Sequence, residues 1–347
     1  MVATADLLLR FIDDEQSSDV LPKARQWDRA IREDGTIAIL PERPSPFLFR
    51  GQTSRYTPCY PSIVRRFARH ELGLNALEPI DQAKLVVNVI RSWWFAETLK
   101  LHPAMKWAAS EHISVDPIAI AQHYGIPTGY IDLTESVAVA AFFATCAWRN
   151  GGWTPVTSGE GVLYRLAWAQ FPEVAYRVRP IALQPFPRPR EQWGWTIALH
   201  LSEDFESLPL QAVRFAHSAR VSQRVFDMFD GGSKLFPPDV MHEAALKINS
   251  ATTLPKSIAQ NVSDDFNDDP QGLNGRSPNA LLEFAVNLLG VNFTSSPPEV
   301  FSAEIADRAE MTWQQTKDSF YRSVGFRMIR EPKNQTVGEQ GGEPERR

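Results

Sequence analysis

Two stretches of the sequence decide the fold: Phe47-Leu48-Phe49-Arg50-Gly51-Gln52, and Ala121-Gln122-His123-Tyr124-Gly125-Ile126-Pro127-Thr128 running into Ile131-Asp132-Leu133-Thr134. The first places an arginine and a glycine at the end of a short apolar run, which is typical of a strand end. The second places a histidine at the end of a short helix, then a Gly-x-Pro turn, then an acidic residue. Rigid elements aim the polar side chains at their ends, so such places commonly build sites. We expect the two stretches to share one cleft.

The composition is that of an ordinary globular protein. The chain has 347 residues, of which 43% are hydrophobic and 22% charged, enough for one large domain or two ordinary ones. Its two cysteines, Cys59 and Cys146, give no disulfide framework, which fits a reducing compartment. Residues 1–12 lack the features of a secretory signal, and the longest apolar run, 137–148, is too short to span a bilayer. We therefore expect a cytoplasmic protein without a membrane partner.

The charge argues against broad binding to nucleic acids. The formal net charge is −5, whereas sequence-independent binding needs a positive surface. A local basic cluster remains an alternative, because Arg177, Arg179, Arg188 and Arg190 lie close together in the sequence.

The order of expected elements predicts an α+β fold, because helices and strands follow one another without regular alternation. We expect a mixed or antiparallel sheet with helices, followed by a helical C-terminal region. Asp81, Asp116, Thr134 and Asp239 are expected helix caps. The expected helices are 1–34, 81–101, 116–124, 135–148, 240–248, 279–289 and 303–321; the strands are 36–40, 47–49, 161–168 and 192–201; and 178–190 and 262–278 are irregular. The expected regions are an N-terminal helical segment (1–34), the sheet domain (35–205), a helical region (206–330) and a disordered tail (331–347).

Arg50 and His123 each have two interpretations. Arg50 could place its guanidinium on a phosphate or carboxylate, with Gly51 admitting a ligand to the backbone, or it could form a structural salt bridge. His123 could act in a site, or it could be a satisfied, partly buried side chain at a helix end. The rigid turn 125–128 fixes His123 relative to Asp132 and so favours the site.

The segment Arg190-Glu191-Gln192-Trp193-Gly194-Trp195 opens a later strand. Gly194 within a strand indicates a close approach of a ligand or a second backbone, or else a bulge. Gln192 could bond to a ligand or only to a neighbouring loop. No metal is expected: His242-Glu243 lacks the second histidine of a zinc helix, and Pro270 occupies the glycine position of a calcium loop.

These motifs resemble the FRG domain, a family named for its Phe-Arg-Gly signature, over roughly residues 35–200. The matching pieces, in the family's order, are 49–52, Pro61-Ser62, Arg65, 121–128, Asp132, Thr134, 138–144, 161–164 and 190–195. There is one departure. Where the family usually reads Thr-Arg-Leu-Leu-Asp-Trp-Thr, this chain has Gly129 and Leu133 in place of the arginine and the tryptophan. If that arginine belongs to the family's site, its absence implies altered or lost activity.

The order of the blocks is similar to that of ADP-ribosyltransferases, in which an early arginine holds the NAD phosphates. The resemblance implies an NAD- or nucleotide-processing enzyme with ADP-ribosyltransferase or NAD glycohydrolase activity, in a bacterial defence or toxin setting, with NAD as substrate. The expected catalytic residues are His123, Asp132 and Glu191; the expected ligand-binding residues are Arg50, Gly51, Gln52, Tyr124, Thr134 and Gln192. No Glu-x-Glu pair stands where such enzymes carry it. The alternative is a non-catalytic module that senses a ligand or binds a protein or nucleic acid.

Overall fold

A seven-stranded mixed sheet forms the centre of the structure, a computed structural model that describes residues 2–17, 27–32, 34–41, 44–67, 77–268 and 278–330. The strand order is β1-β11-β8-β4-β5-β10-β9. The strands are β1 (Ala3–Thr4), β4 (Leu48–Gln52), β5 (Tyr130–Thr134), β8 (Glu160–Leu166), β9 (Val178–Pro180), β10 (Gly194–Ala198) and β11 (Leu210–Ala216). All neighbours are antiparallel except β1 and β11. The predicted α+β class is confirmed.

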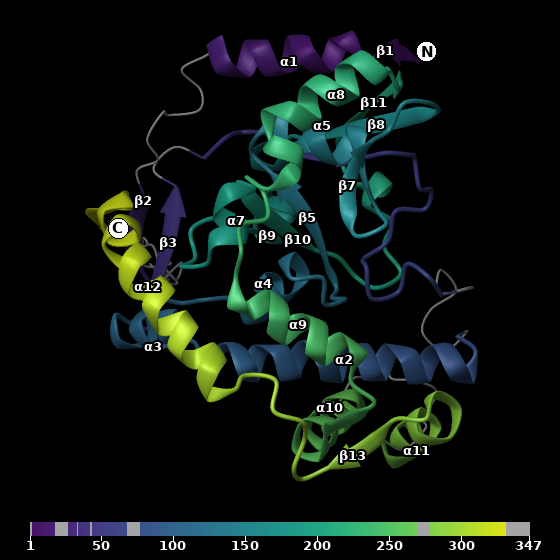
Figure 1. The fold of residues 1–347 in the computed structure, drawn as a ribbon, viewed down its shortest axis with the longest axis vertical. Coiled ribbons are helices and arrows are strands. Elements are labelled where there is room, and N and C mark those ends of the chain that lie inside the picture. The colour runs from purple at the N-terminus through teal and green to yellow at the C-terminus, as the bar shows by residue number, and fades with distance from the viewer. Residues whose placement is uncertain are drawn as a thin grey trace, which may run out of the picture.

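Helices cover one face of this sheet. α5 (Val137–Thr145) lies directly on β4 and β8, and α1 (Asp6–Ser17) and α8 (Ala219–Met228) pack around it (Figure 1). Their shared core includes Leu8, Phe142 and Phe215. Leu48, Ile131, Tyr164 and Trp195 belong to a separate core, built largely from the alternate positions of the same strands.

A helical layer forms the other half of the molecule, at the bottom and left of Figure 1. The long helix α2 is its centre, with Leu85, Ile90 and Phe95 fully buried. The helices of this layer are α2 (Pro79–Leu99), α3 (Pro103–Ser110), α4 (Pro117–His123), α9 (Val240–Ser250), α10 (Lys256–Asp268), α11 (Pro278–Leu289) and α12 (Ala303–Ser323). Three small sheets complete the structure: β14 (Val324–Arg330) with β2 (Trp27–Ile31) and β3 (Ile37–Pro41), β6 (Cys146–Arg149) with β7 (Gly152–Pro155), and β12 (Thr253–Pro255) with β13 (Asn292–Thr294).

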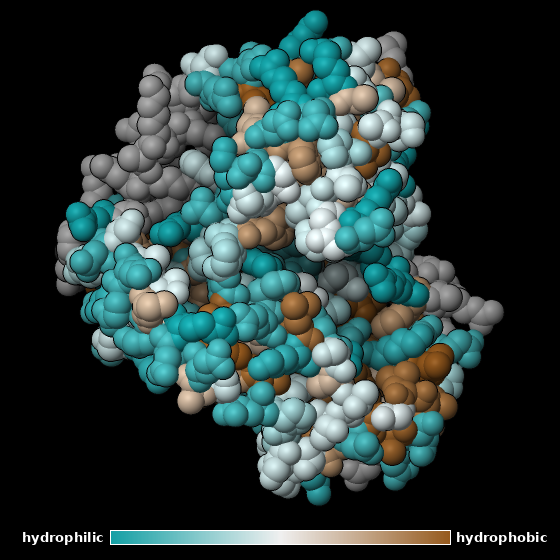
Figure 2. Space-filling model, viewed as in Figure 1, coloured by the Kyte–Doolittle hydropathy of each residue, from teal (hydrophilic) through white to brown (hydrophobic). Residues whose placement is uncertain are grey.

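The surface in view is mostly hydrophilic, with hydrophobic side chains gathered around α2 and α11 at the lower right (Figure 2). None of the helices in the described part of the chain combines the length and the apolar composition that a membrane span requires. The expected tail, 331–347, lies outside the described residues.

Several predicted elements differ from the structure. The segment expected to be helical from 1 to 34 contains β1 and β2 besides α1, and β11 of the central sheet lies beyond residue 205. The segments expected to be irregular hold β9, the short helix α7 (Pro187–Glu191) and most of α10. Propensity alone could not place these strands, because their partners are distant in the sequence.

The expected helix caps differ at two of four positions. Asp116 and Asp239 cap α4 and α9 as predicted, each accepting a backbone N–H. The helix expected from residue 135 begins later, because Ser136 caps α5; it also ends at Thr145, since the chain continues as β6. α2 begins at Pro79 rather than at Asp81.

Close packing of α5 on the sheet requires glycine at two positions. A Cβ on Gly51 would overlap the Ala140 carbonyl oxygen and lie 2.7 Å from Ala144 N. A Cβ on Gly161 would lie 3.0 Å from Ala144 O. The glycine of the Arg50-Gly51 signature therefore serves the approach of a helix backbone.

We predict that Gly51→Ala lowers the free energy of unfolding by about 3 kcal/mol, because the backbone of α5 cannot move away without opening the core. Gly152→Ala is the matched control, since a Cβ there meets nothing within 4 Å. Urea denaturation monitored by tryptophan fluorescence measures both. Equal midpoints for the two variants would contradict this packing.

His102 makes folding depend on pH. Its Nδ1 accepts the Ala104 N–H at the start of α3, and burial lowers its pKa to about 4. The unfolded chain therefore binds a proton that the folded chain does not, so stability is lost as the pH falls below about 6.5.

We predict that the wild type loses about 2 kcal/mol of unfolding free energy between pH 7 and pH 5 through His102 alone. His102→Asn keeps a capping acceptor without a titrating ring, so its loss over this interval should be smaller by that amount. The exposed His200, changed to asparagine, is the control. Parallel pH dependences for wild type and His102→Asn would disprove the assignment.

Candidate functional site

A cleft of about 540 Å³ opens where β4 and β5 separate. The two strands pair only at Phe49 and Thr134. Continuing this antiparallel register would place Gly51 opposite Asp132, but the ladder has already ended. Instead the Arg50 side chain enters the gap, and its Nη1 donates to the Asp132 carbonyl oxygen at 2.8 Å. Arg50 therefore lies within a strand that runs to Gln52, and the expected strand end at residue 49 is wrong.

The structure brings most of the predicted residues to this cleft. Its lining includes Arg50, Gly51, Gln52, His123, Asp132, Thr134 and Gln192. They come from β4, from α4, from β5 and from the turn before β10. Among the described residues, no group of three or more His, Cys, Asp or Glu side chains is arranged to hold a metal ion.

The Asp132 carboxylate lies between Gln122 and His123. Gln122 Nε2 donates to Asp132 Oδ2 at 3.2 Å, and His123 Nε2 lies 3.6 Å from Oδ1. The Asp132 side chain is 39% exposed, whereas that of His123 is 2% exposed. Asp132 is therefore the carboxylate presented to a ligand, and His123 lies behind it.

Three hydrogen bonds fix the orientation of Gln122. Ser62 Oγ and Thr128 Oγ1 each donate to Gln122 Oε1 at 2.8 Å, so the amide nitrogen must face Asp132. Ser62 Oγ in turn accepts the Thr128 N–H. The motif residues 122–128 thus contribute to one hydrogen-bond network, and this network positions the Asp132 carboxylate.

Gln192 and Gly194 fix the ring of His123. His123 Nδ1 lies 3.1 Å from Gln192 Oε1, and Gln192 Nε2 donates to Leu235 O at 3.0 Å. Because Gln192 offers an oxygen, Nδ1 carries the proton and Nε2 faces the carboxylate. A Cβ on Gly194 would lie 2.9 Å from His123 Cε1, so this glycine makes room for the ring.

Two arginines give the cleft a positive side. No carboxylate of the described residues forms an ion pair with Arg50 or Arg65, and Arg50 Nε is buried without a partner. Burial and the neighbouring Arg50 charge lower the pKa of Arg65. An arginine still remains protonated at neutral pH, so the two guanidinium groups repel each other until an anion lies between them.

Aromatic side chains form the remaining walls. Tyr56 and Trp148 are 52% and 61% exposed at the rim, and Phe143, Trp153 and Phe236 line the interior. Tyr124, Trp193 and Trp195, the aromatic residues of the quoted motifs, do not line the cleft. Trp195 belongs instead to the core of the sheet.

Two predicted site residues lie elsewhere. Glu191 is half-exposed at the end of α7 beside Arg190 and does not line the cleft. Tyr124 is buried against Phe95, and its hydroxyl donates to Asp239. Burial raises the pKa values of both Tyr124 and Asp239. Tyr124 therefore joins α4 to α9 and does not face a ligand.

The basic cluster expected at 177–190 is not a free surface. Arg177 pairs with Glu203, and Arg179 donates to backbone oxygens of Tyr176 and Val178. Arg188 is buried, with its guanidinium over the Tyr124 ring.

The sequence reasoning missed Gln122 and Arg65 as site residues, and Tyr56 and Trp148 as walls. Gln122 and Arg65 belong to the quoted motifs, so the sequence contained the information needed to name them as site residues. Tyr56 and Trp148 gave none, because each lies beyond the motifs and reaches the cleft only through the tertiary fold.

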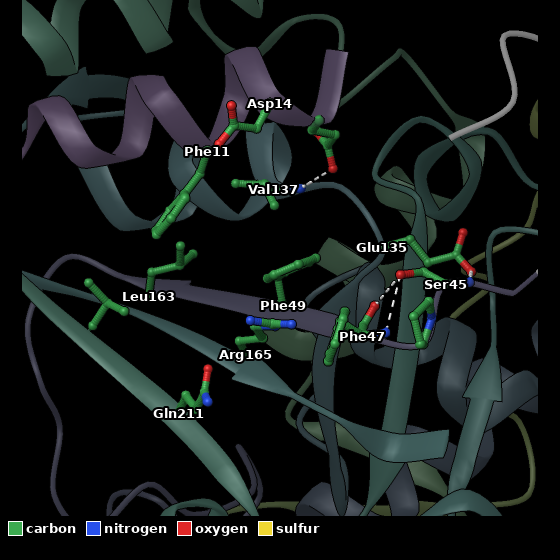
Figure 3. A pocket seen from close by; sticks show the side chains of 13 residues that line it. Phe11, Asp14, Ser45, Phe47, Phe49, Glu135, Val137, Leu163, Arg165 and Gln211 are labelled. Atoms are coloured by element: carbon green, nitrogen blue, oxygen red, sulfur yellow. Dashed lines mark hydrogen bonds between the residues drawn. The ribbon is translucent and has the colours of Figure 1, made fainter. Parts of the chain in front are cut away.

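A second cavity, of about 440 Å³, lies beneath α1 (Figure 3). Phe11 of α1 points toward Leu163 and Phe49 of the sheet, and Arg165 lies over the Phe47 ring. Glu15 accepts the Val137 N–H at the start of α5, at 2.6 Å. Most of the lining is apolar, and its charged groups serve this packing; it offers no polar network comparable to that around Asp132.

The departure from the family pattern reaches the cleft lining at one of its two positions, Leu133. Gly129 does not line the cleft, and a Cβ there would face Leu199 and Leu201. Leu133, in place of the tryptophan, is buried in the core with Trp195.

We predict that Gly194→Ala destabilises the wild type by about 1–3 kcal/mol, because the new methyl displaces the His123 ring. In a His123→Ala background the same change should cost less, and the difference is the coupling energy of a double-mutant cycle. Urea unfolding of the four proteins measures it. Identical costs in both backgrounds would mean that the ring is not what this glycine accommodates.

Comparison with known proteins finds a family model that matches part of the chain. No curated protein and no solved structure matches the chain. The family model described as the FRG domain matches residues 45–151, a segment that runs from just before β4 through β6 and contains Arg50, His123 and Asp132. Gln192 and Gly194, which complete the site, lie outside the matched segment. The resemblance of the motifs is thereby confirmed, and residues 45–151 of this chain are an FRG domain.

Proposed function

We propose that the cleft binds NAD or a closely related nucleotide and cleaves its N-glycosidic bond, transferring ADP-ribose to an acceptor or to water. The observation that carries this proposal is the Asp132 carboxylate, which accepts a hydrogen bond from Gln122, beside two arginines that form no ion pair with a carboxylate of the described residues. A cation for phosphate and a carboxylate for a developing positive charge are the two groups that such a reaction needs.

Each part of the cleft has a role in this proposal. Arg50 and Arg65 hold the pyrophosphate. Tyr56 or Trp148 at the rim stacks on a base. Asp132 faces the ribose carbon C1′ of the nicotinamide riboside. Because His123 is almost fully buried, it packs behind Asp132 and does not touch the ligand.

The bond that breaks joins C1′ to the nicotinamide nitrogen, and its electron pair leaves with the nicotinamide as a neutral molecule. The Asp132 carboxylate stabilises the positive charge that develops on the ribose. A hydroxyl group or water then bonds to C1′ and loses its proton. Positioned charges of this kind make the largest single contribution to the rate enhancement of many enzymes.

We predict that Arg50→Ala weakens NAD binding about 10- to 150-fold, because it removes charge-assisted hydrogen bonds worth about 1.5–3 kcal/mol. Isothermal titration calorimetry measures it, with the exposed Arg10→Ala as control. Equal heats for wild type and Arg50→Ala, or none for either, would overturn the assignment of the phosphate site.

We predict that Asp132→Asn lowers NAD turnover about 100-fold or more while leaving NAD binding nearly unchanged, since the amide keeps the shape and loses the charge. Release of nicotinamide, followed by chromatography, is the readout. Binding without turnover in the wild type would instead favour the ligand-sensing module. No glutamate among the described residues lines the cleft, and this observation favours the ligand-sensing module.

A further inference from the structure

A basic groove continues from the cleft along α2. It has a volume of about 770 Å³ and shares Arg65, Gln122 and Gly125 with the cleft. We call it the α2 groove. Its charged lining residues are Arg65, Arg66, Lys84 and Arg91, and none of its lining residues is acidic. The whole chain has a net charge of −5, so this concentration of positive charge is local.

The helix α2 gives the groove a regular basic edge. Lys84, Asn88 and Arg91 lie four and three residues apart, which puts them on one stripe of the helix. The stripe is about 10 Å long at 1.5 Å per residue. Asn249 and Thr252 add polar groups near the end of α9.

Several of these cations lack a buried ion pair. Arg66 is exposed and makes no ion pair with any described residue. Lys84 pairs only with Asp81, one turn away at the helix surface, and such pairs contribute little. Arg91 donates to Ala251 O through Nη2, while its Nε is buried without a partner. The groove thus holds positive charge that folding alone does not neutralise.

We propose that the α2 groove binds the phosphate backbone of a single-stranded nucleic acid, one nucleotide of which reaches the cleft. A positive groove that tracks a backbone, joined to aromatic side chains that stack on bases, is the arrangement that single-strand binding requires. The aromatic part is supplied by Tyr56 and Trp148 of the cleft. The choice of a nucleic acid over an acidic peptide rests on the proposed function, because the cleft at the end of the groove is built for a nucleotide.

In the proposed reaction such a strand would be the acceptor of ADP-ribose. With NAD bound, Arg65 and one rim aromatic serve NAD, and the strand keeps Arg66, Lys84, Arg91 and the other aromatic. A base or hydroxyl group of the strand would bond to C1′ as nicotinamide leaves, and would release one proton to solvent. Binding of the strand does not require NAD, so the two proposals can fail separately.

The test is the affinity of a fluorescein-labelled 12-nucleotide single strand, measured by fluorescence anisotropy between 0.05 and 0.5 M salt, without NAD. Four phosphate contacts give a slope of log K against log salt of about −2.8 for a single strand. Arg66→Ala with Lys84→Ala should bring the slope to about −1.4 and weaken binding about 25-fold at 0.1 M salt.

The matched control is Arg10→Ala with Lys100→Ala, which removes the same charge away from the groove. Lys100 pairs with Glu97 across three residues of α2, as Lys84 pairs with Asp81. The control should keep the slope and affinity of the wild type. Equal losses in the two double variants would show that only net charge matters and would overturn the proposal.

Two further arms separate the alternatives. Polyglutamate that displaces the strand at equal charge concentration would assign the groove to an acidic peptide instead. A duplex bound as tightly as the single strand would also overturn it. If the strand binds as expected while NAD is neither bound nor cleaved, the groove stands and the proposed NAD chemistry fails.

Discussion

The early end of the β4–β5 ladder is the constraint on which the candidate site depends. α5 lies so close to β4 that Gly51 has no room for a Cβ, and the two strands stay paired only at Phe49 and Thr134. Beyond that pair the Asp132 carbonyl has no strand partner on this side, and the Arg50 guanidinium takes its place. A buried carbonyl without a partner is costly, and the hydrogen bond from Arg50 removes that cost. The remaining donors of the guanidinium group face the cleft.

The polar network around Asp132 follows from that opening. A carboxylate side chain in a gap of the sheet can adopt several rotamers unless neighbouring side chains fix one of them. Gln122 donates to one carboxylate oxygen and the His123 ring packs beside the other. Each is held by a partner of its own: Ser62 and Thr128 for the amide, Gln192 for the ring. The network spans four separate segments of chain. Its members position one another, which is how a fold obtains a precise site from flexible side chains.

The positive charge of the cleft and the α2 groove also depends on contacts between distant segments of the chain. The arginines between Arg177 and Arg190 lie close together in the sequence. In the fold they contact Glu203, backbone oxygens and an aromatic ring. Arg50, Arg65, Arg66 and Arg91 are scattered in the sequence and gather at the cleft and the α2 groove, where Asp132 is the acidic residue of the lining. Proximity in the sequence is therefore a poor guide to an anion site, because folding decides which charges meet a partner.

The sequence by itself determined the α+β class, the short helix ending at His123, the caps at Asp116 and Asp239, and the membership of residues 45–151 in the FRG family. These features depend on the pattern of neighbouring residues, which the sequence shows directly. Only the tertiary structure decided that Gly51 serves α5 and Gly194 serves His123, that Tyr124 faces Asp239, and that Glu191 stays outside the cleft. It also placed β11 in the central sheet. The reason is physical: each of these outcomes is a contact between segments tens to more than a hundred residues apart, and side-chain packing across such distances leaves no periodic trace in the sequence.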